Sequence, residues 1–141
     1  MFKKILIAND GSEGAFKALA AALQLAHSYK ARAHMICVDE IPWMLGGSSR
    51  EEAISEKEMA DRKFTEVVAK AEVEAKRHGV ELVSHIVIGR PAPAIVAFIA
   101  RDGFDLLVTG FKGHSALYHR ILGKTTDRLV ELAPCAVLVV K

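Results

Sequence analysis

Short apolar runs alternate along this chain with longer stretches in which apolar residues recur at helical spacing. Four of the runs predict strands; they lie at 4–8, 33–38, 105–109 and 136–140. The run at 4–8 is nearly continuous, which is typical of a strand covered on both faces of a sheet, and the run at 33–38 repeats this pattern. In a fifth run, at 80–88, apolar residues occupy alternate positions. That alternation indicates a half-covered strand and predicts that this strand lies at a sheet edge.

The stretches between these runs predict four helices. They begin after Ser12, at about Arg50, at Pro91 and at about Thr125. Ser12 is suited to capping the first helix, because its hydroxyl can accept a hydrogen bond from a backbone N–H of the first turn. Gly79 closely follows the predicted end of the second helix and Gly103 that of the third, which is the usual place for glycine.

Five strands alternating with four helices predict an α/β fold. We expect a single domain over residues 1–141, with an open five-stranded parallel sheet and helices on both faces. Polar, glycine-bearing turns follow the first strand, at 10–12, and the fourth, at 110–113. In such sheets ligands bind beyond the carboxyl ends of the strands, where the strand order reverses. If both turns serve one site, the strand order is 3-2-1-4-5 and not the flavodoxin-like 2-1-3-4-5.

Composition narrows the class of protein. Hydrophobic residues make up 51% of the chain, which is too apolar for intrinsic disorder, and the net charge of +2 gives no strong field for nucleic acid. The N-terminal apolar run is too short for a signal peptide, and no window approaches the roughly 20 apolar residues of a membrane span. Cys37 and Cys135 lie in apolar surroundings that suit reduced thiols. We therefore expect a cytoplasmic protein that binds neither nucleic acid nor membrane.

Three glycines after the fourth strand carry the main chemical signal: Gly110, Gly113 and Gly123. Glycine allows a positive φ and a close approach of the main chain, so that N–H groups and a helix start can surround an anion. Each glycine taken alone is also explained as a turn residue. The sequence Gly123-Lys124-Thr125 matches the end of a P-loop, but the first glycine of that motif would fall on Tyr118 and no strand directly precedes it. A P-loop NTPase is therefore excluded.

Asp10, at the carboxyl end of the first strand, has two interpretations. Aspartate is common in turns and caps, but this position is also where ligands bind in the predicted fold. Its carboxylate could hold Mg²⁺ through water beside a triphosphate, so a metal is expected only together with a nucleotide. The six histidines show no paired spacing of a zinc site, and no Ser-His-Asp arrangement follows from the spacing.

Several separated segments resemble the universal stress protein family along nearly the whole chain. The matching segments are Ile5–Ser12, Gly89–Pro91, Asp105–Gly110 and Ala133–Val140. The most specific match is G-x2-G-x9-G, the pattern of the ATP-binding branch, which is met by Gly110, Gly113 and Gly123. The resemblance implies a five-stranded α/β domain that binds ATP or a related adenine nucleotide. It also implies a homodimer formed by pairing of the last strands, here residues 136–140.

The resemblance implies a role for each matched residue. Main-chain groups near Ala8 and Val38 would contact the adenine edge, and Asp10 would lie against the ribose or the phosphate-bound metal. The other residues assigned to the nucleotide site are Asn9, Gly110, Gly113, Gly123, Lys124, Thr125 and Thr126. The family usually has Ser or Thr directly after the third glycine, whereas this chain has Lys124. Lys124 would favour phosphate by its charge, and Thr125 or Thr126 could supply the hydroxyl.

Three functions follow from these observations. The first is an adenine-nucleotide-binding module of the stress response, with slow or no hydrolysis because no arginine finger or Walker signature is found. The second is an adenylating enzyme of the related α-hydrolase type, which would release pyrophosphate. The third is a dimerising adaptor without nucleotide, in which Lys124 marks a site that has lost ATP; nucleotide that co-purifies with the protein would exclude it.

Overall fold

All five strands pair in parallel in one sheet. In the computed structural model, which describes residues 1–40, 49–112 and 122–141, the strands are β1 (Lys4–Ala8), β2 (Arg32–Asp39), β3 (Leu82–Ile88), β4 (Leu106–Gly110) and β5 (Ala136–Val140). Their order is β3-β2-β1-β4-β5, so the predicted order 3-2-1-4-5 is confirmed. The strand order reverses at β1: β2 and β3 are added on one side of it, and β4 and β5 on the other.

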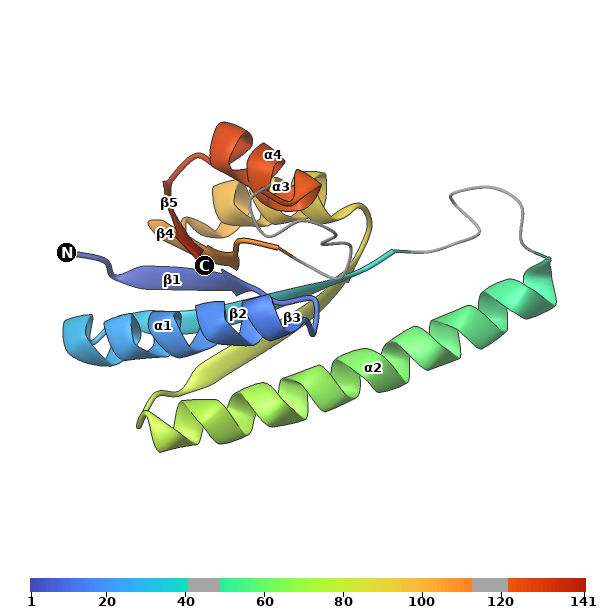
Figure 1. The fold of residues 1–141 in the computed structure, drawn as a ribbon, viewed down its shortest axis with the longest axis horizontal. Helices are drawn as coiled ribbons and strands as arrows, with labels where there is room; N and C mark the ends of the chain where they lie inside the picture. The colour runs from blue at the N-terminus through green and yellow to red at the C-terminus, as the bar shows by residue number, and fades with distance from the viewer. Residues whose placement is uncertain (41–48, 113–121) are drawn as a thin grey trace.

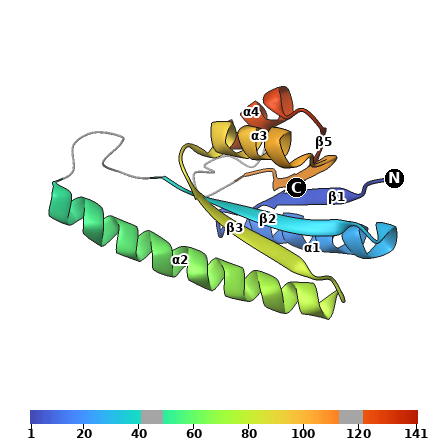
Figure 2. The ribbon, with the colours of Figure 1, turned by 180° about the vertical axis from the view of Figure 1, so that it is seen from behind.

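Helices cover both faces of the sheet, as predicted. They are α1 (Glu13–Tyr29), α2 (Arg50–Arg77), α3 (Pro91–Asp102) and α4 (Lys124–Leu132). Figures 1 and 2 show α1 and α2 on one face, and α3 and α4 on the other. The N-terminal part of the long helix α2 extends well past the carboxyl ends of the strands (Figure 1).

Residues of each inner strand point alternately into two cores. Ile5 and Ile7 pack in the core beneath α1 and α2, whereas Leu6 packs in the core beneath α3 and α4. All three side chains are fully buried. Burial on both faces explains why the strand is apolar at successive positions and not only at alternate ones.

The helix ends follow the sequence signals. The Ser12 hydroxyl accepts a hydrogen bond from the Ala15 N–H at 3.2 Å, and Pro91 is the first residue of α3. Ser49 and Glu52 form a reciprocal capping box at the start of α2, a signal of the S-x-x-E type. These local contacts fix where the helices begin relative to the strand ends.

The two outer strands differ in sequence pattern but share exposed apolar side chains. In β3 the side chains of Val83, Ile86 and Ile88 are 43–52% exposed, which agrees with the edge position predicted from its alternation. In β5 the side chain of Leu138 is 37% exposed. The hydrogen-bonding edge of β5 opposite β4 has no strand beside it within the described residues.

A histidine pair that the spacing of the sequence did not reveal bridges β2 and β3. His34 Nδ1 lies 2.9 Å from His85 Nε2; the ring planes are within 3° of parallel and the centroids are 5.3 Å apart. The distance between the two ring centroids is longer than the distance between the two nitrogens. The difference is about the sum of the centroid-to-nitrogen distances within the two rings, so each nitrogen lies close to the line that joins the centroids. The rings therefore lie end to end in one plane, as an N–H···N hydrogen bond requires. One ring donates and the other accepts, so at least one of them is neutral.

The surroundings of this pair disfavour its charged form. Burial lowers the pKa of His34 most, His85, Lys4 and Arg32 lower it further, and Asp102 opposes them. Burial is also the main cause that lowers the pKa of His85, with Arg101 and Lys4 adding to it and Asp102 opposing it. Phe98 and Phe104 pack against the rings. In the unfolded chain a histidine titrates at about 6.5, so as the pH falls the unfolded chain takes up protons first.

We expect the free energy of unfolding to be retained above about pH 6.5 and to decrease below it. Urea denaturation of the wild type at about pH 7.5 and about pH 5 measures the difference. In His85→Gln the difference between the two free energies should become smaller, because the partly buried pair that resists protonation is lost. His27→Gln, at an exposed position of α1, is the matched control and should behave as the wild type. An unchanged pH dependence in His85→Gln would contradict this explanation.

Candidate functional site

A cavity of about 450 Å³ lies at the carboxyl ends of the strands. Every predicted site residue that the structure describes lines it: Ala8, Asn9, Asp10, Val38, Gly110, Gly123, Lys124, Thr125 and Thr126. Gly113, the remaining predicted residue, lies outside the described residues. The cavity sits where the strand order reverses, because the ends of β2 and β4 flank that of β1. The topology thus brings together segments more than a hundred residues apart in the sequence.

The turn after β1 is built by its own side chains. The Asn9 carboxamide oxygen accepts a hydrogen bond from the Gly11 N–H at 2.8 Å, and the Asp10 carboxylate accepts one from the Ser12 N–H at 3.0 Å. The Asn9 amide also donates to the Met35 sulfur at 3.4 Å. Asn9 is only 3% exposed, so its side chain positions the turn, whereas Asp10 is exposed at the cavity wall. Both interpretations of Asp10, as turn residue and as site residue, therefore fit its position.

Gly123 is the N-cap of α4 and has an ordinary extended conformation, with φ −60° and ψ 147°. Within the described residues no side-chain hydrogen bond caps this helix, and its first three residues, Lys124, Thr125 and Thr126, line the cavity. Such a helix start is suited to binding an anion, and Lys124 adds a positive charge there. The expectation of a positive φ is not met at Gly123; what this position contributes is a helix start without a side-chain cap.

Gly110 serves the packing of the fold. It also lacks a positive φ, but a Cβ atom at this position would lie 2.8 Å from the carbonyl carbon and oxygen of Gly14 in α1. A Cβ on Gly14 would in turn lie 2.7 Å from the main-chain oxygen of Lys112. Both glycines are therefore required by the close approach of α1 to the end of β4. The main chain at Gly110 does make a close approach, and its neighbour is the main chain of α1. The approach to an anion stays a prediction.

The two threonines of α4 differ in what their hydroxyls do. The buried Thr126 hydroxyl donates to the Gly110 carbonyl oxygen at 2.8 Å, which ties the start of α4 to the end of β4. Thr125 is exposed and also lines the cavity. Of the two residues predicted to replace the usual hydroxyl, Thr125 is thus the better placed.

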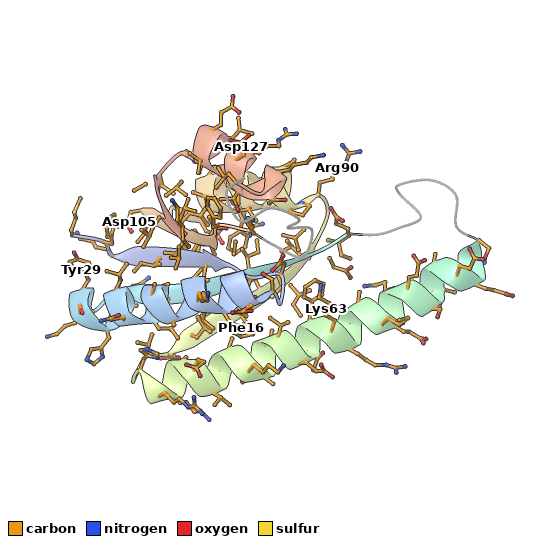
Figure 3. All side chains as sticks on the ribbon, viewed as in Figure 1. Phe16, Tyr29, Lys63, Arg90, Asp105 and Asp127 are labelled. Atoms are coloured by element: carbon orange, nitrogen blue, oxygen red, sulfur yellow. The ribbon has the colours of Figure 1, made fainter. Side chains whose placement is uncertain are left out.

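Several charged residues that were not assigned to the site also line the cavity. Asp39 is the last residue of β2 and Glu40 directly follows it, so the rule about strand ends could have identified both. Lys112 follows β4, and Lys63 comes from α2. Figure 3 shows Lys63 directed from α2 toward the turn after β1, and its Cε would lie 3.5 Å from a Cβ on Gly11. The position of Lys63 depends on how α2 crosses the sheet, which the sequence pattern does not define.

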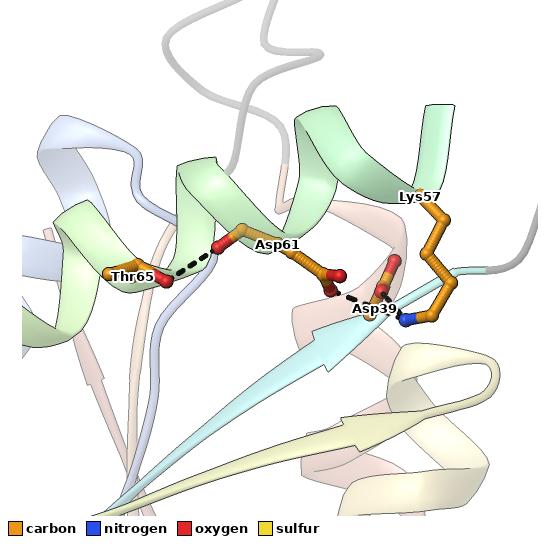
Figure 4. A network of polar contacts seen from close by, with 4 residues as sticks. All are labelled: Asp39, Lys57, Asp61 and Thr65. Atoms are coloured by element: carbon orange, nitrogen blue, oxygen red, sulfur yellow. Dashed lines mark hydrogen bonds and ion pairs between the residues drawn. The ribbon is translucent and has the colours of Figure 1, made fainter. Parts of the chain in front are cut away.

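An ion-pair network connects α2 with the end of β2 (Figure 4). Lys57 Nζ lies 3.5 Å from the carboxylate of the buried Asp39 and 3.3 Å from that of Asp61. The hydrogen bond to Asp61 is the largest cause that raises the pKa of Lys57, and Asp39 adds to it. Thr65 donates to the Asp61 carbonyl oxygen at 2.7 Å. Lys57 is largely solvated, so this network positions α2 over the cavity more than it stabilises the fold.

Apart from Lys63, which comes from α2, the charged residues of the cavity wall are separated by strand. The acidic side chains of Asp39 and Glu40 come from the β2 side, whereas Lys112 and Lys124 come from the β4 side. Asp10 lies between them, at the end of β1. A ligand with hydrogen-bond donors at one end and negative charge at the other would match this distribution.

Two further classes of site were searched for among the described residues. In the described ranges, no group of three or more His, Cys, Asp or Glu residues is arranged to hold a metal ion. Nor does the described part of the chain contain a helix of the length and apolarity needed to cross a membrane.

A family model and the sequences of known proteins match this chain over its whole length. The model of the universal stress protein family matches residues 1–141. A universal stress protein of Thermus aquaticus is 35% identical over 143 residues, which cover 100% of both chains. Another, from Methanocaldococcus jannaschii, is 32% identical over 143 residues, which cover 100% of this chain and 83% of the relative.

Solved structures share the fold. A universal stress protein from Lactobacillus plantarum superposes with a TM-score of 0.87 at 21% identity, covering 99% of this chain and 98% of the other. One in complex with cAMP has a TM-score of 0.77 at 21% identity, with 99% and 97% covered. A family member from Arabidopsis thaliana with AMP bound has a TM-score of 0.72 at 18% identity, with 99% and 91% covered. The match of the family model over all 141 residues and the relatives of 32% and 35% identity show that the chain belongs to the universal stress protein family.

Proposed function

We propose that this protein is a regulatory module of the stress response that binds ATP or a related adenine nucleotide. The observation that carries the proposal is the convergence of the uncapped start of α4, Lys112, Lys124 and the turn after β1 on one cavity of about 450 Å³. That volume lies in the range of small-molecule sites, which is about 300–1,000 Å³. Family members with cAMP and with AMP bound support the choice of an adenine nucleotide.

The separated charges suggest how the nucleotide is oriented. Its phosphates would lie against Lys124 and the first N–H groups of α4, where the helix dipole favours negative charge. Its base and ribose would lie toward β1 and β2, with the main chain near Ala8 and Val38 at the adenine edge. Val38 and Ala60, which are partly exposed, supply apolar surface to the cavity, which suits a base.

Magnesium would enter this site together with the nucleotide. Carboxylates at the ends of β1 and β2 line the cavity, but among the described residues they do not form a cluster of three ligands. We therefore propose that Asp10 contacts any Mg²⁺ indirectly, through water beside the phosphates, since Mg²⁺ retains much of its hydration. The protein would act through the occupied or empty state of its nucleotide site, with slow or no hydrolysis of ATP.

We place the protein in the cytoplasm, where its two free thiols would stay reduced.

Reversing the charge of Lys124 tests the proposed orientation. In Lys124→Glu we expect the affinity for ATP to fall about tenfold or more, because a charge-assisted contact is lost and repulsion is gained. The fold should be retained, since an acidic residue in the first turn of a helix is favourable. Isothermal titration calorimetry with ATP, AMP and cAMP measures the affinities, and thermal unfolding measures the stability.

Arg128→Glu is the matched control, because Arg128 is exposed on the same helix and does not line the cavity. Its ATP affinity should stay within about threefold of the wild type. Equal affinities in Lys124→Glu and wild type would place the nucleotide elsewhere. A wild-type protein that binds no adenylate and releases none on heat denaturation would favour the adaptor. Pyrophosphate release with an acceptor would favour the adenylating enzyme.

We further propose a homodimer formed through residues 136–140. The strand β5 ends the sheet within the described residues, and an unpaired edge strand is a template for another chain. Exposed apolar side chains lie on it and on the neighbouring helix: Leu138 at 37%, Val130 at 49% and Leu132 at 45%. Two copies pairing along β5 would cover this surface symmetrically.

Leu138→Lys should shift the protein from dimer to monomer in analytical ultracentrifugation, because it places a charge on the pairing strand. The loss of edge pairing should raise the dimer dissociation constant at least about tenfold. Ile86→Lys provides the control at the opposite edge, on β3, where the side chain is 48% exposed, and should leave the dimer intact. A wild type that stays monomeric at all concentrations would contradict the proposal, as would dissociation by Ile86→Lys alone.

A further inference from the structure

Lys112 is an unusual lysine. Its ammonium nitrogen is buried and has no hydrogen-bond partner among the residues that the structure describes. The Ser84 hydroxyl is the one other buried side-chain polar atom in this state within the described ranges. A hydroxyl is neutral, whereas an unpaired ammonium is among the least favourable groups to bury. The nearest compensation is the ring of Phe111, whose centroid lies 5.9 Å away, at the outer limit of a cation–π contact.

The main chain holds Lys112 in this position. Its carbonyl oxygen packs so closely on Gly14 that a Cβ there would lie 2.7 Å away. The residue lines the cavity on the β4 side, as Lys124 and the uncapped start of α4 do. A buried ammonium on the side of the cavity that also carries a second lysine and a helix start is arranged for a ligand of high negative charge.

We propose that Lys112 selects polyphosphates over monophosphates. Its ammonium supplies the counter-charge to the second or third phosphate of a bound nucleotide, whereas a single phosphate is satisfied by the start of α4 and Lys124. This assignment rests on the proposed function, because it assumes that phosphates occupy the β4 side of the cavity. It predicts opposite effects of one substitution: removing the charge should stabilise the empty protein and weaken its binding of polyphosphate.

The experiment compares Lys112→Met with Lys17→Met, which removes the same charge from an exposed position of α1. We expect Lys112→Met to raise the melting temperature of the ligand-free protein and to lower the affinity for ATP about tenfold or more. Its affinity for AMP should change less than about threefold. Inorganic tripolyphosphate, which has no base, should lose affinity in parallel with ATP. Lys112→Arg, which keeps the charge, should restore the preference for ATP over AMP. Lys17→Met should match the wild type in all four measurements.

The outcomes separate this inference from the proposed function. A lower melting temperature with an unchanged ratio of ATP to AMP affinity in Lys112→Met would make Lys112 a structural residue and overturn the inference, while leaving nucleotide binding intact. If Lys112→Met fails to fold, loss of the ATP preference in Lys112→Gln, with AMP binding retained, supports the inference, and retention of that preference overturns it. A wild type that binds tripolyphosphate through Lys112 but no adenylate would support the subsite and reject the nucleotide. Binding of none of the three ligands would reject both.

Discussion

The main chains of α1 and β4 approach so closely that neither contact position can carry a side chain. Gly110 meets the backbone of Gly14, and Gly14 meets that of Lys112. This contact holds the start of α1, and with it the turn after β1, beside the end of β4. The Gly110 carbonyl also accepts the Thr126 hydroxyl, which places the start of α4 at the same point. A methyl group at either glycine would separate these segments and open the cavity.

Much of the fold could be predicted from the sequence because the inner strands and β3 carry their burial in their patterns, whereas β5 is continuously apolar although it lies at the edge of the sheet. Ile5, Leu6 and Ile7 are fully buried on alternating faces, and their continuous apolarity signals two covering layers. The alternation in β3 signals an edge. The strand order followed from chemistry, since two polar turns can share one site only if β1 and β4 are neighbours. Periodicity alone would have left the order undetermined.

The features of the fold and of the site that escaped prediction depend on contacts between distant segments. His34 and His85 meet because β2 and β3 pair in parallel with a register that their sequence spacing does not reveal. Lys63 lines the cavity because of the way in which α2 packs across the sheet, which brings this part of the helix to the strand ends. Two glycines of the motif also contribute in ways that the sequence pattern did not indicate. Gly110 and Gly123 have ordinary φ values, and their roles are close packing and an uncapped helix start.

Polar groups at the cavity divide into those used by the fold and those left for a ligand. The Asn9 side chain accepts a hydrogen bond within the turn after β1, and the Thr126 hydroxyl donates one to the Gly110 carbonyl oxygen. Lys124 sits in the first turn of α4, at the positive end of the helix dipole, where a cation is unfavourable. The ammonium of Lys112, which has no hydrogen-bond partner among the described residues, lies on the same side of the cavity. Each of these positive charges costs stability in the empty protein, and one anion bound between them would relieve both costs. A cavity that concentrates positive charge against its own stability is what selection for an anionic ligand would produce, whereas selection for stability alone would remove it.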